Sequence, residues 1–254
     1  MPELEISADA PRAAPGRVGH PALPNKSSLN AQRHHCRSIA YTYTEPTVFF
    51  EYARDTAMLA RTAGLANVFV SNGYMTDEAL DMARGWLDAA NVDLKAFRDA
   101  TYRHHVGARL QPVLDSLIKM KQLNIWLEIT TLIVPGINDD PQELKELAEF
   151  VCQHLGADTP WHVSRFFPCY QMNQTPATPV ATLHRVEEIG RAAGLRHIYL
   201  GNVAEETNTF CSGCGQQLIR RIGFEVVENR TAADGNCPSC DQPLAGVGMA
   251  GSPP

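Results

Sequence analysis

The sequence has no long hydrophobic run and no excess of positive charge. No apolar stretch approaches the roughly 20 residues that a membrane-spanning helix needs. The opening MPELEIS is acidic and lacks the apolar core of a secretory signal, so we expect a cytoplasmic protein with reduced thiols. Acidic residues outnumber basic ones, 28 to 22, and the net charge of -6 argues against nonspecific binding to nucleic acid or to an anionic membrane.

The chain is long enough for one large α/β domain with a small appendage. Its 254 residues include 44% hydrophobic and 20% charged residues, which is typical of a globular protein. Residues 1–35 are weakly patterned and rich in Pro, Ala, Gly and Ser, so they are predicted to be an irregular N-terminal remnant.

Strand-like and helix-like segments alternate from residue 36 onward. The six predicted strands are SIAYTY, NVFVSNG, NVDLKAF, IWLEITTLIVPG, PWHVSRFFP and HIYLGNV. Five segments with apolar residues at helical spacing separate them. The second of these helices is expected to have an inner face made of Leu80, Ala83, Leu87 and Ala90. This alternation predicts a parallel sheet covered by helices, and six strands are fewer than the eight of a closed TIM barrel. We therefore predict a partial (β/α)6 TIM-like barrel over residues 36–205.

Polar residues gather at the carboxyl ends of these predicted strands, where such folds place their chemistry. They are Glu45 in YTEP, Asn72 in SNGY, Asp93 and Lys95 in DLK, and His162 in WHVS. Side chains two apart on a strand share a face, and an ion pair facing apolar helices would be costly. Asp93 and Lys95 are therefore expected to face the barrel interior, and His162 is expected to share a face with Ser164.

Each of these residues also has a simpler structural interpretation. Glu45 could cap the helix that follows it, and Asn72 could belong to an ordinary turn. Asp93 and Lys95 could form a structural pair, and His162 could be a hydrogen-bonded core histidine. The repetition of polar groups at the same end of successive strands favours a ligand-binding role for the set.

Longer motifs in the same segments resemble those of a known family. SIAYTYTEPTVFFEY, VSNGY, NVDLKAF, TLIVPGINDD, PWHVSRFFPCYQM and IYLGNV resemble motifs of the radical SAM superfamily, in the branch that includes pyruvate formate-lyase activating enzyme. Together with the cysteine pairs near the C-terminus, they are most similar to the radical SAM component of the AmmeMemoRadiSam system. The resemblance covers roughly residues 36–246.

The resemblance implies cofactors and residue roles. Relatives hold S-adenosylmethionine against a 4Fe-4S cluster and produce a 5′-deoxyadenosyl radical. By resemblance, Glu45 would hold the ammonium of the methionyl group, and His162 would lie near the nucleoside. Asn72, Asp93 and Lys95 would lie near the methionyl group and the ribose. Memo-like and AMMECR1-like proteins would be partners, and the substrate, a protein or a small molecule, is unknown.

The cluster motif of that family, C-x3-C-x2-C, is absent from this sequence. Fe–S clusters are held by cysteine thiolates, and Cys36, Cys152 and Cys169 lie on different predicted elements, which is typical of core-filling residues. The opening PELEISADAPRAAPGR resembles the segment that follows the third cluster cysteine in relatives. We therefore expect an N-terminally truncated barrel without its first strand, with an unpaired edge at residues 38–44. As written, the polypeptide is expected to be inactive in reductive cleavage of S-adenosylmethionine.

Two C-x2-C pairs follow the predicted barrel, with the spacing C-x2-C-x22-C-x2-C. Their members are Cys211, Cys214, Cys237 and Cys240. Two such pairs offer the four thiolates that tetrahedral zinc prefers, and disulfides or an Fe–S cluster are the alternatives. We predict a zinc-ribbon-like module over residues 206–246, followed by a disordered tail at 247–254.

Two function classes follow from these patterns. The first is a radical SAM enzyme-type protein that binds S-adenosylmethionine. The second is a noncatalytic truncated barrel whose zinc ribbon serves as a protein-binding module.

Overall fold

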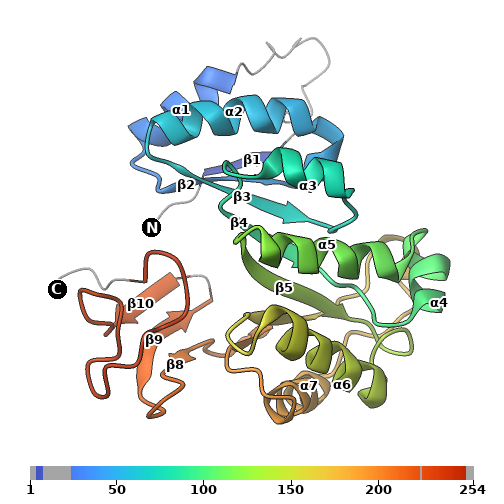
Figure 1. The fold of residues 1–254 in the computed structure, drawn as a ribbon. Helices are drawn as coiled ribbons and strands as arrows, with labels where there is room; N and C mark the ends of the chain where they lie inside the picture. The colour runs from blue at the N-terminus through green and yellow to red at the C-terminus, as the bar shows by residue number, and fades with distance from the viewer. Residues whose placement is uncertain (1–3, 8–23, 224, 250–254) are drawn as a thin grey trace. The chain divides into compact units, whose positions relative to one another are not determined.

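A computed structural model describes residues 4–7, 24–223 and 225–249 (Figure 1). The chain forms two compact units. The first consists of the residues up to Leu94 and Gln111–Leu127, and the second of Lys95–Leu110 and the residues from Glu128 onward. The predicted N-terminal remnant and the predicted tail lie partly outside the described residues. The predicted boundary at residue 206 lies within the second unit and stays a prediction.

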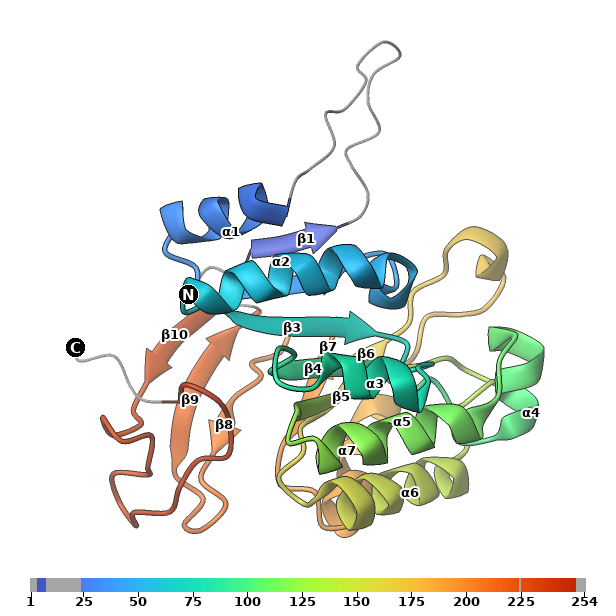
Figure 2. The same ribbon diagram turned by 45° about the horizontal axis from the view of Figure 1, so that its top comes forward.

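Parallel strands and crossover helices build the first unit. Its strands lie side by side in chain order. They are β1 (Leu4–Ser7), β2 (Ser38–Thr42), β3 (Ala66–Ser71) and β4 (Ala89–Asp93). Its helices are α1 (Pro24–Arg33), the 3-10 turn η1 (Pro46–Phe49), α2 (Phe50–Thr62), α3 (Asp77–Ala83) and α5 (Leu110–Gln122). Helices α1 and α2 run beside each other along β1 to β3 (Figure 2).

Strand β1 and helix α1 correct the prediction of an irregular start. The sequence predicts a missing first strand and an unpaired edge on β2, but β1 pairs with β2 in parallel, with Leu4 opposite Ile39. Helix α1 has proline at its first position, where the missing N–H costs nothing. Its buried residues, Ser28 and Ala31, are small, which lets α1 pack closely on α2.

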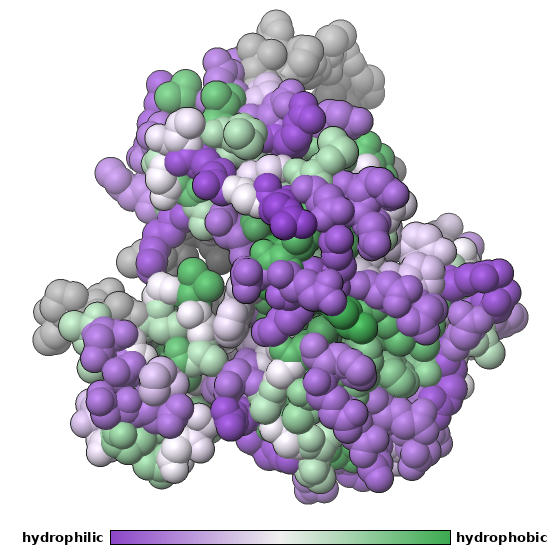
Figure 3. All heavy atoms as spheres, viewed as in Figure 1, coloured by the Kyte–Doolittle hydropathy of each residue, from purple (hydrophilic) through white to green (hydrophobic). Residues whose placement is uncertain are grey.

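An aromatic cluster fills the core of the first unit. Phe69 on β3 contacts Tyr41, Phe50 and Trp86, with ring centroids 5.6–6.5 Å apart. Tyr41 donates a hydrogen bond from its hydroxyl to the Asn67 side chain at 3.0 Å, and burial raises the pKa of Tyr41 well above its usual value. These buried rings fix α2 against the strands. Hydrophilic residues predominate on the face shown in Figure 3, as expected for helices whose apolar sides are buried.

The second unit repeats the strand–helix pattern and adds a small antiparallel sheet. Its parallel strands are β5 (Trp126–Ile133), which begins in the first unit, β6 (Trp161–Arg165) and β7 (Ile198–Gly201). Its helices and turns are α4 (Asp99–Thr101), η2 (Tyr102–Val106), α6 (Pro141–Phe150), η3 (Val151–Leu155), η4 (Tyr170–Met172) and α7 (Val180–Ala192). The antiparallel strands are β8 (Thr209–Phe210), β9 (Gln217–Ile222) and β10 (Glu225–Asn229).

The predicted fold class, parallel strands alternating with helices, is confirmed. All six predicted strands are present as β2 to β7. The prediction for the second helix was wrong in its length, because α3 ends at Ala83 and Ala90 lies on β4. Gly85 has φ +81°, which turns the chain there, and Ala90 pairs with Phe69 on β3. No helix in the described part of the chain is long and apolar enough to cross a membrane.

Gly190→Ala in α7 is expected to lower the free energy of unfolding by about 1–2 kcal/mol. A Cβ there would lie 2.7 Å from Ile198 Cδ1 and 2.9 Å from Trp161 Cζ3. The Trp161 ring is held because its N–H donates to Thr131 Oγ1 at 3.0 Å, so overpacking outweighs the gain of about 1 kcal/mol in helix propensity. Urea denaturation measures the change, with the exposed Glu188→Ala as control. A variant more stable than the wild type would contradict this packing.

Candidate functional site

Burial alternates along β4, and the polar residues are on the more exposed face. Val92 and Leu94 are fully buried, whereas Asp93 and Lys95 are partly exposed. Because successive side chains of a strand point to opposite faces, Asp93 lies on the face away from the buried apolar residues. The predicted orientation of Asp93 and Lys95 toward a barrel interior and their contact with a ligand stay predictions.

The Glu45 carboxylate organises the strand ends of the first unit. Its two oxygens accept hydrogen bonds from Ser71 Oγ and from the Asn72 backbone N–H, both at 2.8 Å. Glu45 also precedes η1 and accepts from the Thr47 backbone N–H at 3.4 Å. The helix-cap interpretation therefore holds, and the same carboxylate also ties the end of β2 to the end of β3. The Thr47 hydroxyl donates to Oε1 as well, at 3.3 Å, so three donors share Oε1. Oε2 accepts one hydrogen bond from the described residues, and each oxygen of an ionised carboxylate has about two acceptor positions, so Oε2 can accept a further donor.

Asn72 and Gly73 form a tight turn at the end of β3. The Asn72 side-chain oxygen accepts the Tyr74 backbone N–H at 2.8 Å, so the turn interpretation also holds. Gly73 has φ +72°, and a Cβ there would lie 2.6 Å from Val92 Cγ1 on β4. Ser71 is the register partner of Val92, so the next residues, Asn72 and Asp93, stand at neighbouring strand ends. The first unit therefore brings Glu45, Asn72 and Asp93 to one edge.

Lys95, at the start of the second unit, is held through its backbone. Its N–H donates to the Tyr102 hydroxyl at 3.1 Å, and its carbonyl accepts from Asn138 Nδ2 at 2.6 Å. Asn138 is buried, with 3% of its surface exposed, and it also donates to the Leu132 carbonyl at 2.8 Å. Sequence reasoning missed Tyr102 and Asn138 as positioning residues. The polar GIND segment after β5 carried the only signal for Asn138.

His162 lies on the partly exposed face of β6 between two neighbours. Its Nε2 is 2.7 Å from Glu128 Oε2 on β5, and because an ionised carboxylate only accepts, Nε2 donates. Its ring lies 5.4 Å from the Tyr199 ring on β7, tilted by 31°. His162 is thus a hydrogen-bonded histidine on a polar face. Sequence reasoning missed Glu128, which the alternation of IWLEITT places opposite the buried Leu127.

The four C-terminal cysteines come together as predicted. All four Sγ atoms lie within 4.8 Å of one another, close enough to bind one metal ion. The two pairs have matching turns: Gly215 N–H donates to the Cys211 carbonyl, and Asp241 N–H donates to the Cys237 carbonyl, both at 2.9 Å. Gly215 and Asp241 have φ +76° and +60°, which allows the backbone of each turn to fold back around its two thiols. This geometry is that of paired metal-binding turns.

The electrostatics of the four thiols favour a cation between them. Burial raises the pKa of the Cys211 thiol, but hydrogen bonds from the backbone N–H groups of Cys214 and Gly213 and from the neighbouring thiols together outweigh it and lower the pKa to about 6. For Cys240, the Gln242 N–H lowers the pKa, but the neighbouring thiols, first that of Cys211, outweigh it and raise the pKa to about 12. One thiolate therefore makes the next harder to form, and a bound cation allows all four to ionise.

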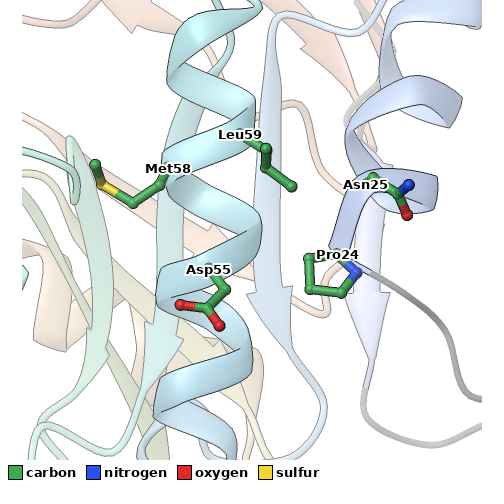
Figure 4. A pocket seen from close by; sticks show the side chains of 5 residues that line it. All are labelled: Pro24, Asn25, Asp55, Met58 and Leu59. Atoms are coloured by element: carbon green, nitrogen blue, oxygen red, sulfur yellow. The ribbon is translucent and has the colours of Figure 1, made fainter.

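The remaining cysteines do not form a second group in the described residues. Cys36 is buried, Cys152 is partly buried and Cys169 is exposed, and none of them joins a metal-ligand cluster. The hollow drawn in Figure 4 lies between α1 and α2 and is lined by Pro24, Asn25, Asp55, Met58 and Leu59. None of the candidate site residues lines it, and we assign it no function.

Comparison with known proteins finds similarity to the radical SAM superfamily. The model of the Radical SAM superfamily matches residues 26–151. An uncharacterized protein of Methanocaldococcus jannaschii is 40% identical over 217 residues, which are 84% of this chain. The chain spans 64% of the length of that curated relative.

Solved structures show the same fold at low sequence identity. A domain of pyruvate-formate lyase-activating enzyme from Bacteroides vulgatus has a TM-score of 0.56 at 15% identity, covering 65% of this chain and 99% of that domain. Streptococcus suis SuiB bound to S-adenosylmethionine has a TM-score of 0.59 at 12% identity, covering 73% of this chain and 44% of SuiB. These likenesses show that the chain has the α/β fold of these structures.

Glu45→Gln is expected to destabilise the protein by about 1–3 kcal/mol, because an amide cannot accept with both ends. One of the two donors, Ser71 Oγ or the Asn72 N–H, would then lose its partner. Glu51→Gln, exposed in the first turn of α2, is the matched control. Chemical denaturation of both variants measures the difference. Equal stability of the two would show that the carboxylate does not tie these strand ends together.

Protein purified anaerobically is expected to contain one metal ion per chain, and Cys237→Ser is expected to lose most of it. Cys169→Ser, which changes an exposed cysteine outside the group, is expected to retain the metal. Inductively coupled plasma mass spectrometry gives the metal content. Metal-free wild type, or the same loss in both variants, would contradict a four-cysteine site.

Proposed function

We propose that this chain is a radical SAM-type protein that binds S-adenosylmethionine at the carboxyl ends of its parallel strands. The superfamily match over residues 26–151 supports the class. The observation that carries the proposal is the set of polar groups at the strand ends of the first unit. There Glu45, Asn72 and Asp93 share one edge, and the Glu45 carboxylate is fixed by two hydrogen bonds of 2.8 Å.

The residue types suit a zwitterionic nucleoside. Carboxylates accept charge-assisted hydrogen bonds from an ammonium, which is the role proposed for Glu45 at the methionyl end. Asn72, Asp93 and Lys95 are assigned to the methionyl group and ribose, and His162 to the nucleoside, following the family resemblance. Glu45 Oε2 accepts one hydrogen bond from the described residues and has a second acceptor position, so its structural role and this proposed role are compatible.

The cysteines of this polypeptide do not fit the 4Fe-4S cluster that the family implies at the barrel. The printed sequence has no C-x3-C-x2-C segment, and the described residues contain one group of metal-binding type, the four C-terminal cysteines. For the 254-residue polypeptide, the proposal is binding of S-adenosylmethionine without its reductive cleavage.

We also propose zinc as the metal of the four C-terminal cysteines. Four thiolates form a closed tetrahedral set that leaves no open position for a substrate, so the role is structural. Membership of the AmmeMemoRadiSam branch, with Memo-like and AMMECR1-like partners, is the finer form of the proposal and follows from the motifs in the sequence alone.

Isothermal titration calorimetry with S-adenosylmethionine tests the binding proposal. The wild type is expected to bind, and Asp93→Asn is expected to bind roughly 10- to 100-fold more weakly, because charge-assisted hydrogen bonds contribute about 1.5–3 kcal/mol. Asp115→Asn, exposed on α5, is the control and is expected to bind like the wild type. A folded wild type that does not bind S-adenosylmethionine would contradict the proposal and favour a noncatalytic protein-binding role.

A further inference from the structure

We propose that the C-terminal cysteine module positions His162, through Arg221 and Tyr199, and so tunes the nucleoside end of the proposed binding site. The module is defined here as β8 to β10 with the four cysteines. This inference rests on the proposed function for the role of His162. The contacts that carry it all lie within the second unit.

The first contact is between the rings of Tyr199 and His162. Their centroids are 5.4 Å apart with a tilt of 31°, and His162 is the register partner of Tyr199 across β6 and β7. On the other side, the Glu128 carboxylate accepts from His162 Nε2 at 2.7 Å. The imidazole is therefore held between a carboxylate on β5 and an aromatic ring on β7. Its orientation depends on both neighbours keeping their rotamers.

The second contact fixes the Tyr199 ring from the module. Its hydroxyl lies 2.9 Å from Thr209 Oγ1 on β8, and the Arg221 guanidinium lies 5.6 Å from its ring centroid. Arg221 Nη1 also donates to the Thr209 hydroxyl at 2.7 Å. Tyr199, Thr209 and Arg221 thus form a closed triangle of contacts. Burial, partly offset by Thr209 and Arg221, raises the pKa of Tyr199, so its hydroxyl stays protonated at neutral pH.

The third step links Arg221 to the metal-binding cysteines. Arg221 lies on β9, whose Leu218 and Ile219 pack with Cys211 and Cys237 in the small core of the module. So few buried apolar residues give little stability on their own, and such modules depend on a metal for their fold. Metal at the cysteines therefore holds β9, β9 holds Arg221, and Arg221 holds the Tyr199 ring against His162.

A set of variants separates this positioning role from general stability. Arg221→Ala and Tyr199→Leu remove the guanidinium and the aromatic ring, while Tyr199→Phe keeps the ring and loses only the hydroxyl. Arg220→Ala is the matched control, because Arg220 is the neighbouring residue on β9 and its guanidinium pairs with the exposed Glu206.

Two readouts follow the effect, affinity for S-adenosylmethionine by calorimetry and the ring resonances of His162 by NMR of histidine-labelled protein. Arg221→Ala and Tyr199→Leu are expected to weaken binding about 3- to 10-fold and to shift the His162 resonances. Tyr199→Phe is expected to bind within about 2-fold of the wild type, since the ring packing is retained. Arg220→Ala is expected to leave both readouts unchanged.

The outcomes distinguish this inference from the proposed function. If the wild type does not bind S-adenosylmethionine but Arg221→Ala still shifts the His162 resonances, the positioning contact stands and the ligand assignment fails. If the wild type binds and Arg221→Ala and Tyr199→Leu match Arg220→Ala in both readouts, the positioning role is overturned. Chelation of the metal from the wild type is expected to reproduce the Arg221→Ala shift, and unchanged His162 resonances in metal-free protein would refute the link to the cysteines.

Discussion

The pleat of the parallel strands separates a buried face from a partly exposed one, and the candidate site depends on that separation. On β6, Trp161 and Val163 are fully buried, while His162 and Ser164 between and after them are partly exposed. Charged and polar groups lose much of their solvation in a dry core and need partners there. On the partly exposed face, such groups can be hydrogen-bonded within the protein and still be accessible to a ligand. The same alternation places Asp93 between the buried Val92 and Leu94.

Sequence patterns predicted the elements that local chemistry encodes. The strands β2 to β7 follow from short apolar runs bounded by turns, and their faces follow from period-two alternation. Strand β1 and helix α1 were missed because their local patterns are weak and β1 gains its hydrogen bonds only by pairing with β2. The end of α3 was missed because the turn at Gly85 and the pairing of β4 with β3 override helical spacing.

The candidate site residues could be predicted from the sequence, but the residues that hold them in position could not. Glu45, Asn72 and His162 stand out at strand ends, whereas Asn138 acts on the backbone of Lys95, 43 positions away, and Glu128 acts on His162, 34 positions away. Contacts of that sequence separation are set by the register of neighbouring strands and helices, which one sequence does not reveal. The two interpretations of Glu45 do not exclude each other, since its carboxylate caps η1 and holds Asn72, and Oε2 has an acceptor position left for the predicted ligand.

Glu45 and His162 are both side chains whose conformation is restrained by contacts within the protein. A side chain that must be ordered when a ligand arrives loses conformational entropy, about 0.5–1.5 kcal/mol for each flexible side chain. The contacts of Glu45 with Ser71 and Asn72 order its side chain when the protein folds, so this entropy is lost before a ligand arrives. The His162 side chain is ordered in the same way only if Glu128 and Tyr199 both hold the ring. Tyr199 is restrained from a strand of the cysteine module, which has a small apolar core. The order of the imidazole therefore depends on the order of that module, so the proposed structural metal would affect His162 without contacting it.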